Sequence, residues 1–308
     1  MIDNPELVAV VSHAAGGPGS TYDPANSQAT TSWHRLVAAE LVLIGVPEDI
    51  GGSGGDIDDL LAVASAIGHS GASFPLLETQ VGTWLAAELG EPVDSRITTV
   101  LLPVESHWIG RWVDQASRVF AITEFDDGRC QATTVAAGTG KTVTDQCGEP
   151  VTVTTTLEET TSWRPVSRAA VDHVRHTLAR GYLAQCYGAL AAAVTLTLRY
   201  ASTREQFGSS IDRFQRVQDL LCACVGETLI VKALLVGTDG GDGTPSRPGL
   251  AHAAAAARSA VGAAFHAVHQ VHGAIGFTTE YPLHHYSLRA IAWCDAAALL
   301  LESHGSQA

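Results

Sequence analysis

Two segments in the C-terminal part of the chain combine residue types that suit nucleotide binding. The first spans residues 199–218 and contains Arg204, Gln206, Phe207 and Gly208 within five positions. Its pattern predicts a helix, a tight turn at Gly208 and a second helix. At such a turn the guanidinium of Arg204 can pair with a phosphate through two parallel hydrogen bonds. Gln206 lies at the same turn, and Phe207 can pack beneath the bound group.

The second segment begins at Gln270 and is predicted to be a helix that ends in a glycine turn. Gly273 and Gly276, with Ala274 between them, let another molecule approach the backbone closely. Gln270 lies one turn earlier and can hydrogen-bond into the same cleft. Each segment alone has an ordinary alternative, because a glycine that ends a helix is commonly a C-cap and the first segment could be a packed corner. Together, in this order and about 65 residues apart, the two segments indicate a binding site much more specifically than either does alone.

The elements that must position these residues form a mostly helical chain with a small β region. Residues 1–100 are predicted as an N-terminal helical domain, in which Asp56 or Asp58 is expected to cap a helix. Residues 101–165 are rich in Thr and Val and predict a middle β domain of about four short strands. Residues 166–308 predict an antiparallel four-helix bundle, with helices at about 168–200, 211–236, 248–274 and 283–302.

Composition narrows the class of protein. Hydrophobic residues make up 46% of the chain and charged residues 16%, which favours a compact globule. The net charge of -14 argues against sequence-independent binding of nucleic acid, which rests on Lys and Arg. No signal peptide or uninterrupted membrane-spanning stretch is expected, so we predict a cytoplasmic protein. The six cysteines lack zinc-binding spacing, and we interpret them all as small buried residues in a reducing compartment.

Two further patterns suggest sites but have simpler interpretations. The stretch 138–142 (GTGKT) is similar to a phosphate-binding loop, but Val135 stands where that loop needs a glycine and no helix follows, so we predict a hairpin turn. His266, His269 and His272 share one helix face, which would permit a metal ion. No carboxylate shares that face nearby, and we predict packing and hydrogen-bonding roles for them and no metal site.

The two nucleotide-type segments resemble those of the acyl-CoA dehydrogenase family. That family carries an R-x-Q-F-G turn and, later, a Q-x-x-G-G-x-G-[FY] motif followed by Tyr-Pro. The stretch 46–56 (VPEDIGGSGGD) is similar to the family's P-E-x-x-G-G-x-G-x-D segment. Ala274 departs from the second motif, since it replaces the second glycine. The resemblance covers nearly the whole chain and is weakest over 101–165.

The resemblance implies FAD as cofactor, shared with a neighbouring subunit that binds most of it. By position, Arg204, Gln206 and Phe207 would contact the pyrophosphate and adenine side of that FAD. The adenosine side would be contacted by the second motif, at Gln270, Gly273, Ala274 and Gly276.

Parts of the family pattern are missing from this chain. The T-E-P-x-x-G-S-D segment, which cradles the flavin ring, has only a weak counterpart at 123–126, so the middle domain is interpreted as truncated. The catalytic glutamate of most members would fall in the stretch 292–297, and that of other members near Leu178, but neither place carries a glutamate. Asp172 and Glu302 are poorly placed to replace it. We therefore expect no catalytic residue here.

This combination resembles the degenerate subunit of α2β2 heterotetrameric, steroid-type acyl-CoA dehydrogenases, a branch that the stretch 284–290 also resembles. It implies a full-length acyl-CoA dehydrogenase partner that supplies the catalytic glutamate and binds most of the acyl-CoA. The complex would α,β-dehydrogenate an acyl-CoA in β-oxidation; a steroid side-chain ester is suggested by the subfamily alone. Two alternatives remain open: an inert scaffold subunit without flavin contact, and a self-sufficient homo-oligomer with a displaced base such as Asp172.

Overall fold

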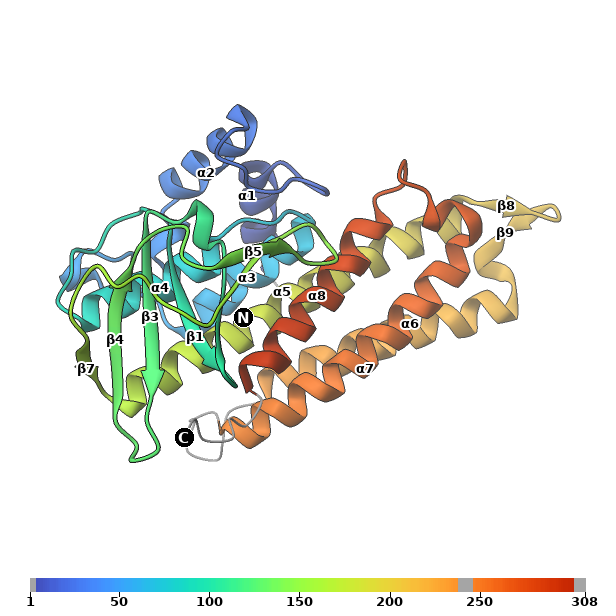
Figure 1. Ribbon diagram of the computed structural model, residues 1–308. Helices are drawn as coiled ribbons and strands as arrows, with labels where there is room; N and C mark the ends of the chain where they lie inside the picture. Colours follow the sequence, from blue (N-terminus) through green and yellow to red (C-terminus); the bar gives the residue numbers. More distant parts are fainter. Residues whose placement is uncertain (1–3, 238–245, 302–308) are drawn as a thin grey trace.

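The computed structural model describes residues 4–237 and 246–301, which form a helical N-terminal part, a mixed sheet and a long helical bundle (Figure 1). The N-terminal helices are α1 (Pro5–Ala15), α2 (Ser27–Ala38), α3 (Ile57–Ser70) and α4 (Leu76–Glu88), with the 3-10 turns η1 (Leu41–Leu43) and η2 (Glu48–Ile50) between α2 and α3. Asp56, one of the two predicted caps, begins α3: its carboxylate accepts hydrogen bonds from the backbone of Asp58 and Asp59.

The sheet has seven strands in the order β5-β6-β2-β1-β3-β4-β7. β1 and β3 are parallel, and the other neighbours in this sheet are antiparallel. The strands are β1 (Thr98–Val104), β2 (His107–Arg111), β3 (Arg118–Glu124), β4 (Cys130–Val135), β5 (Lys141–Thr144), β6 (Pro150–Thr154) and β7 (Arg164–Val166); η3 (Val113–Gln115) lies between β2 and β3. The prediction of about four strands was too low, because several strands are too short to show an alternating pattern.

The predicted hairpin at 138–142 is wrong. The segment joins β4 to β5, but β5 pairs with β6 and not with β4. It is therefore a connection that crosses from one half of the sheet to the other. Turns lie at Asp127-Gly128 and Cys147-Gly148, each stabilised by a backbone hydrogen bond from its glycine.

The bundle consists of α5 (Arg168–Thr203), α6 (Gln215–Val236), α7 (Arg247–His272) and α8 (Leu283–Leu301). Between α5 and α6 lie the small hairpin of β8 (Glu205–Gln206) and β9 (Ser209–Ser210) and the 3-10 turn η4 (Ile211–Arg213); η5 (Gly273–Phe277) links α7 to α8. This confirms the predicted fold class. By length and composition α5 could span a membrane, but most of its apolar stretch is buried inside the fold, as in the core helix of a globular protein.

One hydrophobic core connects the three parts. It includes Leu61 of α3, Leu85 of α4, Phe120 of β3, Leu183 of α5 and Trp293 of α8. The domain boundaries at 100 and 165 stay predictions, since the core is continuous across them. Four cysteines are buried, but Cys147 is half-buried and Cys222 is exposed on α6, so the prediction that all six are buried is wrong.

The closest backbone contact of the core lies where α3 crosses α5. A Cβ atom on Gly68 would lie 1.9 Å from the carbonyl oxygen of Gln185, and one on Gly188 would lie 1.9 Å from that of Ser65. Neither carbonyl can move freely, because each belongs to a helix. The two glycines therefore set the distance between these helices.

We expect Gly188→Ala to destabilise the protein by more than ~3 kcal/mol, since the added methyl group overpacks a backbone contact. Gly226→Ala is the matched control, because a Cβ there meets nothing within 4 Å and α6 continues on both sides. The control should raise the unfolding free energy by ~1 kcal/mol through helix propensity. Urea unfolding of both variants tests this; equal effects would contradict the packing argument.

Candidate functional site

The two nucleotide-type segments meet at one end of the bundle (Figure 1). α5 ends at Thr203, and the chain then turns through the β8–β9 hairpin. The ring of Tyr200 on α5 stacks on His272 at the end of α7, with 4.6 Å between the ring centroids. Beside this pair, Ala201, Ile211 and Val271 form a small apolar cluster of their own. The structure thus brings together two motifs that are far apart in the sequence.

Most of the predicted site residues at this end face outward. Arg204, Gln206, Gln270, Gly273 and Ala274 are all exposed. Within residues 4–237 and 246–301, no carboxylate forms an ion pair with Arg204. An exposed guanidinium held at a structured turn is suited to receive a phosphate from outside the chain.

Phe207 lies at the tip of the hairpin with 95% of its surface exposed, and its backbone φ is 52°. Its only ring neighbour in the described chain is Phe214, edge-on at 6.1 Å. On the second motif, Phe277 is 70% exposed and stacks on His269. Two large aromatic side chains left in water at one end of the bundle indicate a surface that another molecule covers.

The two glycines of the second motif have different structural roles. Gly273 has φ 62° and ψ -141°, a backbone conformation that favours glycine, and a Cβ there would meet nothing within 4 Å. Gly276 is buried, and a Cβ there would lie 2.9 Å from Cβ of His272. Gly273 therefore offers open backbone to a ligand, whereas Gly276 is a glycine because of packing inside the chain.

The three histidines of α7 have separate environments. His266 is exposed, and His269 stacks on Phe277. His272 is buried, with Nδ1 2.9 Å from the carbonyl oxygen of Val268 and Nε2 3.1 Å from the hydroxyl of Tyr281. Burial lowers the pKa values of His269 and His272 below the ordinary value for histidine. These contacts assign His269 and His272 to packing and hydrogen bonding at the helix end.

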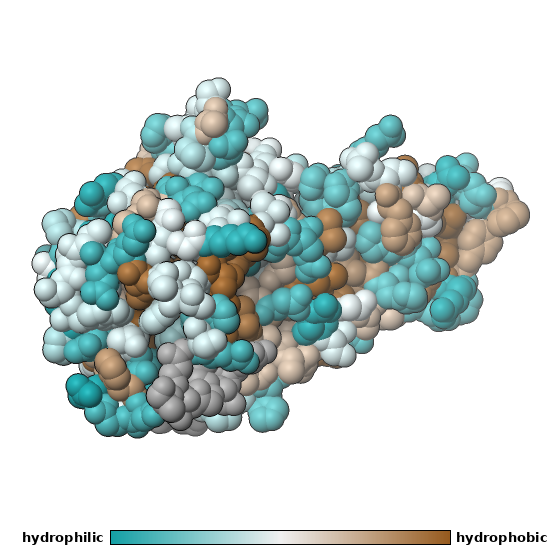
Figure 2. Space-filling view, viewed as in Figure 1, coloured by the Kyte–Doolittle hydropathy of each residue, from teal (hydrophilic) through white to brown (hydrophobic). Residues whose placement is uncertain are grey.

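A cavity of about 510 Å³ lies between the sheet, α4, α5 and α8. Figure 2 shows apolar surface where the sheet region meets the bundle. Leu178 of α5 and Ala292 of α8 both line the cavity. These are the two places where the family resemblance puts a catalytic glutamate; the fold brings them to one cavity, but neither place carries a glutamate.

The carboxylates near these places do not take over the role. Asp295 lines the cavity but is about half-exposed and forms an ion pair with Arg258, with 2.7 Å between Oδ1 and Nε. Asp172 pairs with Arg168 and does not line the cavity. Glu302 lies outside the described residues.

The cavity also contains a buried carboxyl group, Glu78, that no sequence motif indicated. Glu78 of α4 is 5% exposed, and its Oε1 accepts a hydrogen bond of 2.7 Å from the hydroxyl of Tyr182. Burial raises the pKa of Glu78 to about 7, although the Tyr182 hydrogen bond and the nearby Arg111 charge oppose the shift. The sequence signal was a single carboxylate directly after two leucines at the start of α4.

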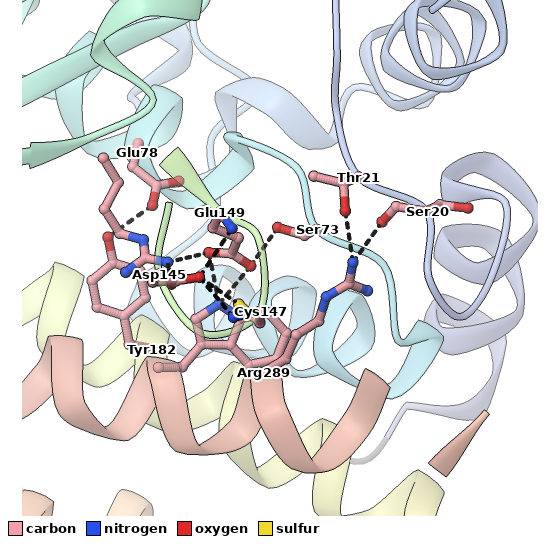
Figure 3. Close-up of polar contacts among 11 residues, drawn as sticks. Ser20, Thr21, Ser73, Glu78, Asp145, Cys147, Glu149, Tyr182 and Arg289 are labelled. Carbon is pink, nitrogen blue, oxygen red and sulfur yellow. Dashed lines mark hydrogen bonds and ion pairs between the residues drawn. The ribbon is translucent and has the colours of Figure 1, made fainter. Parts of the chain in front are cut away.

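A buried ionic cluster closes the other side of the cavity (Figure 3). Arg111 of β2 pairs with both Asp145 and Glu149, which flank the β5–β6 turn. Glu149 also accepts hydrogen bonds from the Ser73 hydroxyl and, at 3.1 Å, from Nε1 of Trp293 on α8. Asp145, Cys147 and Glu149 have the spacing of metal ligands, but Arg111 already supplies the positive charge. The cluster ties the turn to both the sheet and the bundle.

We expect Glu78→Gln to change how stability depends on pH. The folded-state pKa of Glu78 is about 7 against an ordinary 4.5, so the folded state holds its proton more tightly. The contribution of Glu78 to folding stability is fully present when the pH is below the ordinary pKa of 4.5. It is lost as the pH rises through the folded-state pKa of about 7. Between about pH 5 and about pH 8 the wild type should lose ~2 kcal/mol more than the variant.

Chemical denaturation at the two pH values measures this difference. Glu88→Gln, which removes an exposed carboxylate from the same helix, controls for charge alone. If the wild type and Glu78→Gln respond equally to pH, Glu78 is not the buried carboxyl described.

Comparisons with known proteins agree with this geometry. The model of the acyl-CoA dehydrogenase C-terminal domain matches residues 167–292. The structure of the ChsE4-ChsE5 complex from Mycobacterium tuberculosis has 21% identity, with 96% of this chain and 94% of that chain covered and a TM-score of 0.74. A variant of the Tcur3481-Tcur3483 steroid ACAD has 21% identity, with 95% and 93% covered and a TM-score of 0.73.

Butyryl-CoA dehydrogenase from Megasphaera elsdenii has 16% identity, with 94% of this chain and 89% of that chain covered and a TM-score of 0.69. No curated protein sequence matches. The exposed Arg204 and Phe207 fit the phosphate and adenine parts of the FAD that this fold family implies. Residues 167–292 therefore match the acyl-CoA dehydrogenase C-terminal domain, and the chain as a whole has the acyl-CoA dehydrogenase fold.

Proposed function

We propose that this chain is the subunit of a heteromeric, FAD-dependent acyl-CoA dehydrogenase that lacks the catalytic base and completes a partner's FAD site. The observation that carries the proposal is the end of the bundle, where Arg204 and Phe207 face solvent at a structured turn beside the second motif. A side chain such as Phe207 gains about 2 kcal/mol when it is buried against another molecule.

Distance along α5 supports the sharing of the cofactor between chains. Leu178 lines the cavity, whereas Arg204 follows the last residue of the same helix. Helical rise puts about 39 Å between them, more than an extended dinucleotide spans. This separation supports an arrangement in which the ADP part of the FAD lies at Arg204 and its ring is held by a neighbouring chain.

Each residue at the bundle end has a role that its chemistry suits. Arg204 would pair with the pyrophosphate, and Gln206 and Phe207 would contact the adenine side. Gln270, Gly273, Ala274 and Gly276 would form the adenosine side, with Gly276 acting through packing. FAD supplies hydride acceptance when bound, and the partner's glutamate would remove the α-proton of the acyl-CoA. This chain's share is to hold and orient the nucleotide.

The partner and the substrate are also part of the proposal. A full-length acyl-CoA dehydrogenase in an α2β2 assembly, with two FAD per four chains, would pair each bundle end with one flavin site. The similarity to the ChsE4-ChsE5 complex supports a heteromeric assembly. The similarity to a steroid ACAD favours a bulky ring-bearing acyl-CoA, bound mainly by the partner. The self-sufficient homo-oligomer is disfavoured because Asp172 does not line the cavity.

We expect Arg204→Ala to weaken flavin retention in the co-purified complex by roughly tenfold or more, since a charged hydrogen bond to phosphate contributes about 1.5–3 kcal/mol. Flavin content per complex, measured by absorbance after extensive dialysis, is the readout. Arg129→Ala removes an exposed arginine from the β3–β4 turn and is the control. Unchanged flavin content in Arg204→Ala, with the complex intact, would leave the scaffold subunit as the better account.

A further inference from the structure

The cavity between the sheet and α8 has the size and the lining of a ligand site. Its volume of about 510 Å³ lies within the range of small-molecule pockets. Apolar side chains dominate its wall, among them Val100, Leu102, Ile109, Leu178 and Leu300. An occupant must therefore be largely apolar, because polar groups against this wall would lose their hydrogen bonds to water.

Two polar atoms of cavity-lining residues lack partners. In the part of the chain that the structure describes, no hydrogen-bond partner is found for Glu78 Oε2 or for Arg111 Nε. Glu78 is 5% exposed and Arg111 8%. The Tyr182 hydroxyl satisfies only Oε1 of Glu78. A buried polar atom left unpaired costs about 1–3 kcal/mol, so both atoms call for a polar group from an occupant.

Charge decides which polar group suits the cavity. A carboxylate on the ligand would be repelled by Glu78 and by Asp145 and Glu149, which already share Arg111. An ammonium group would lose its hydration against the apolar wall, and the two acidic side chains that could compensate it already share the charge of Arg111. A neutral hydroxyl meets neither obstacle. It can donate to Glu78 Oε2, and its lone pairs can accept from a donor such as Arg111 Nε.

We propose that this cavity binds an apolar molecule bearing one hydroxyl group, and that the ionised carboxylate of Glu78 accepts a hydrogen bond from that hydroxyl. The site belongs to this chain alone and lies at the opposite end of α5 from Arg204, so it is distinct from the proposed flavin contacts. Tyr182 has a positioning role, because its hydroxyl holds Oε1 and leaves Oε2 for the ligand.

Isothermal titration of this chain with n-decanol and with its methyl ether, at a pH well above the Glu78 pKa of about 7, tests the proposal, because the two probes differ in the hydroxyl donor. We expect n-decanol to bind the wild type about tenfold more tightly than the ether. Glu78→Leu should bind both probes with similar affinity. Ala296→Trp, which places an indole in the cavity from the partly exposed face of α8, should weaken binding of both.

The wild-type comparison stands even if Glu78→Leu fails to fold. Equal affinities for alcohol and ether, or no binding of either up to the solubility limit, would overturn the proposal. So would an alcohol preference that persists in folded Glu78→Leu. None of these readouts involves flavin, so they are independent of the proposed subunit role.

Discussion

The close contact between α3 and α5 is the constraint on which the rest of the structure depends. Gly68 of α3 and Gly188 of α5 have no Cβ atom, and each therefore packs directly against a backbone carbonyl of the other helix. This contact fixes α5 against the N-terminal helices, and α5 then carries the cavity wall at Leu178 and the nucleotide-type turn after Thr203. Since a helix is stiff over this length, the two sites are held apart at a set distance.

The buried ionic cluster is the second connection between the parts. Arg111, Asp145 and Glu149 join the β5–β6 turn to β2, and Glu149 reaches Trp293 of α8. A buried ion pair is weak evidence for stability, because desolvation offsets the attraction. Its effect here is geometric: the turn is held against the bundle and forms one side of the cavity. The chain thus has a partly open cavity at the sheet, while its nucleotide-type residues are exposed at the far end of the bundle.

The sequence predicted the helical bundle well because long helices carry a strong periodic signal. The four predicted helices lie within a few residues of α5 to α8, apart from the first residues of the second, where the chain forms η4. Arg204 and Gly273 stand in recognisable local patterns, and the fold brings both patterns to one end of the bundle; their contacts with FAD stay predictions. The sheet was less predictable: strands as short as β7 leave almost no alternation, and the pairing of β2 with β6 is a long-range property.

Burial could not be inferred for single residues. Glu78 looked like an ordinary helix carboxylate, and only the packing of α5 and β2 around it raises its pKa. Cys222 was expected to be buried, yet it lies on the outer face of α6. The burial of Glu78 and the exposure of Cys222 both depend on which elements pack together in three dimensions.

The visible absorption spectrum of this chain, purified alone and then co-expressed with a full-length acyl-CoA dehydrogenase partner, tests the central claim most directly. The account predicts a colourless protein alone and a yellow complex with about one FAD per pair of chains, because Arg204 completes a site whose ring half belongs to the partner. A yellow protein that reduces an acceptor on its own would contradict the account and make the self-sufficient enzyme the leading explanation.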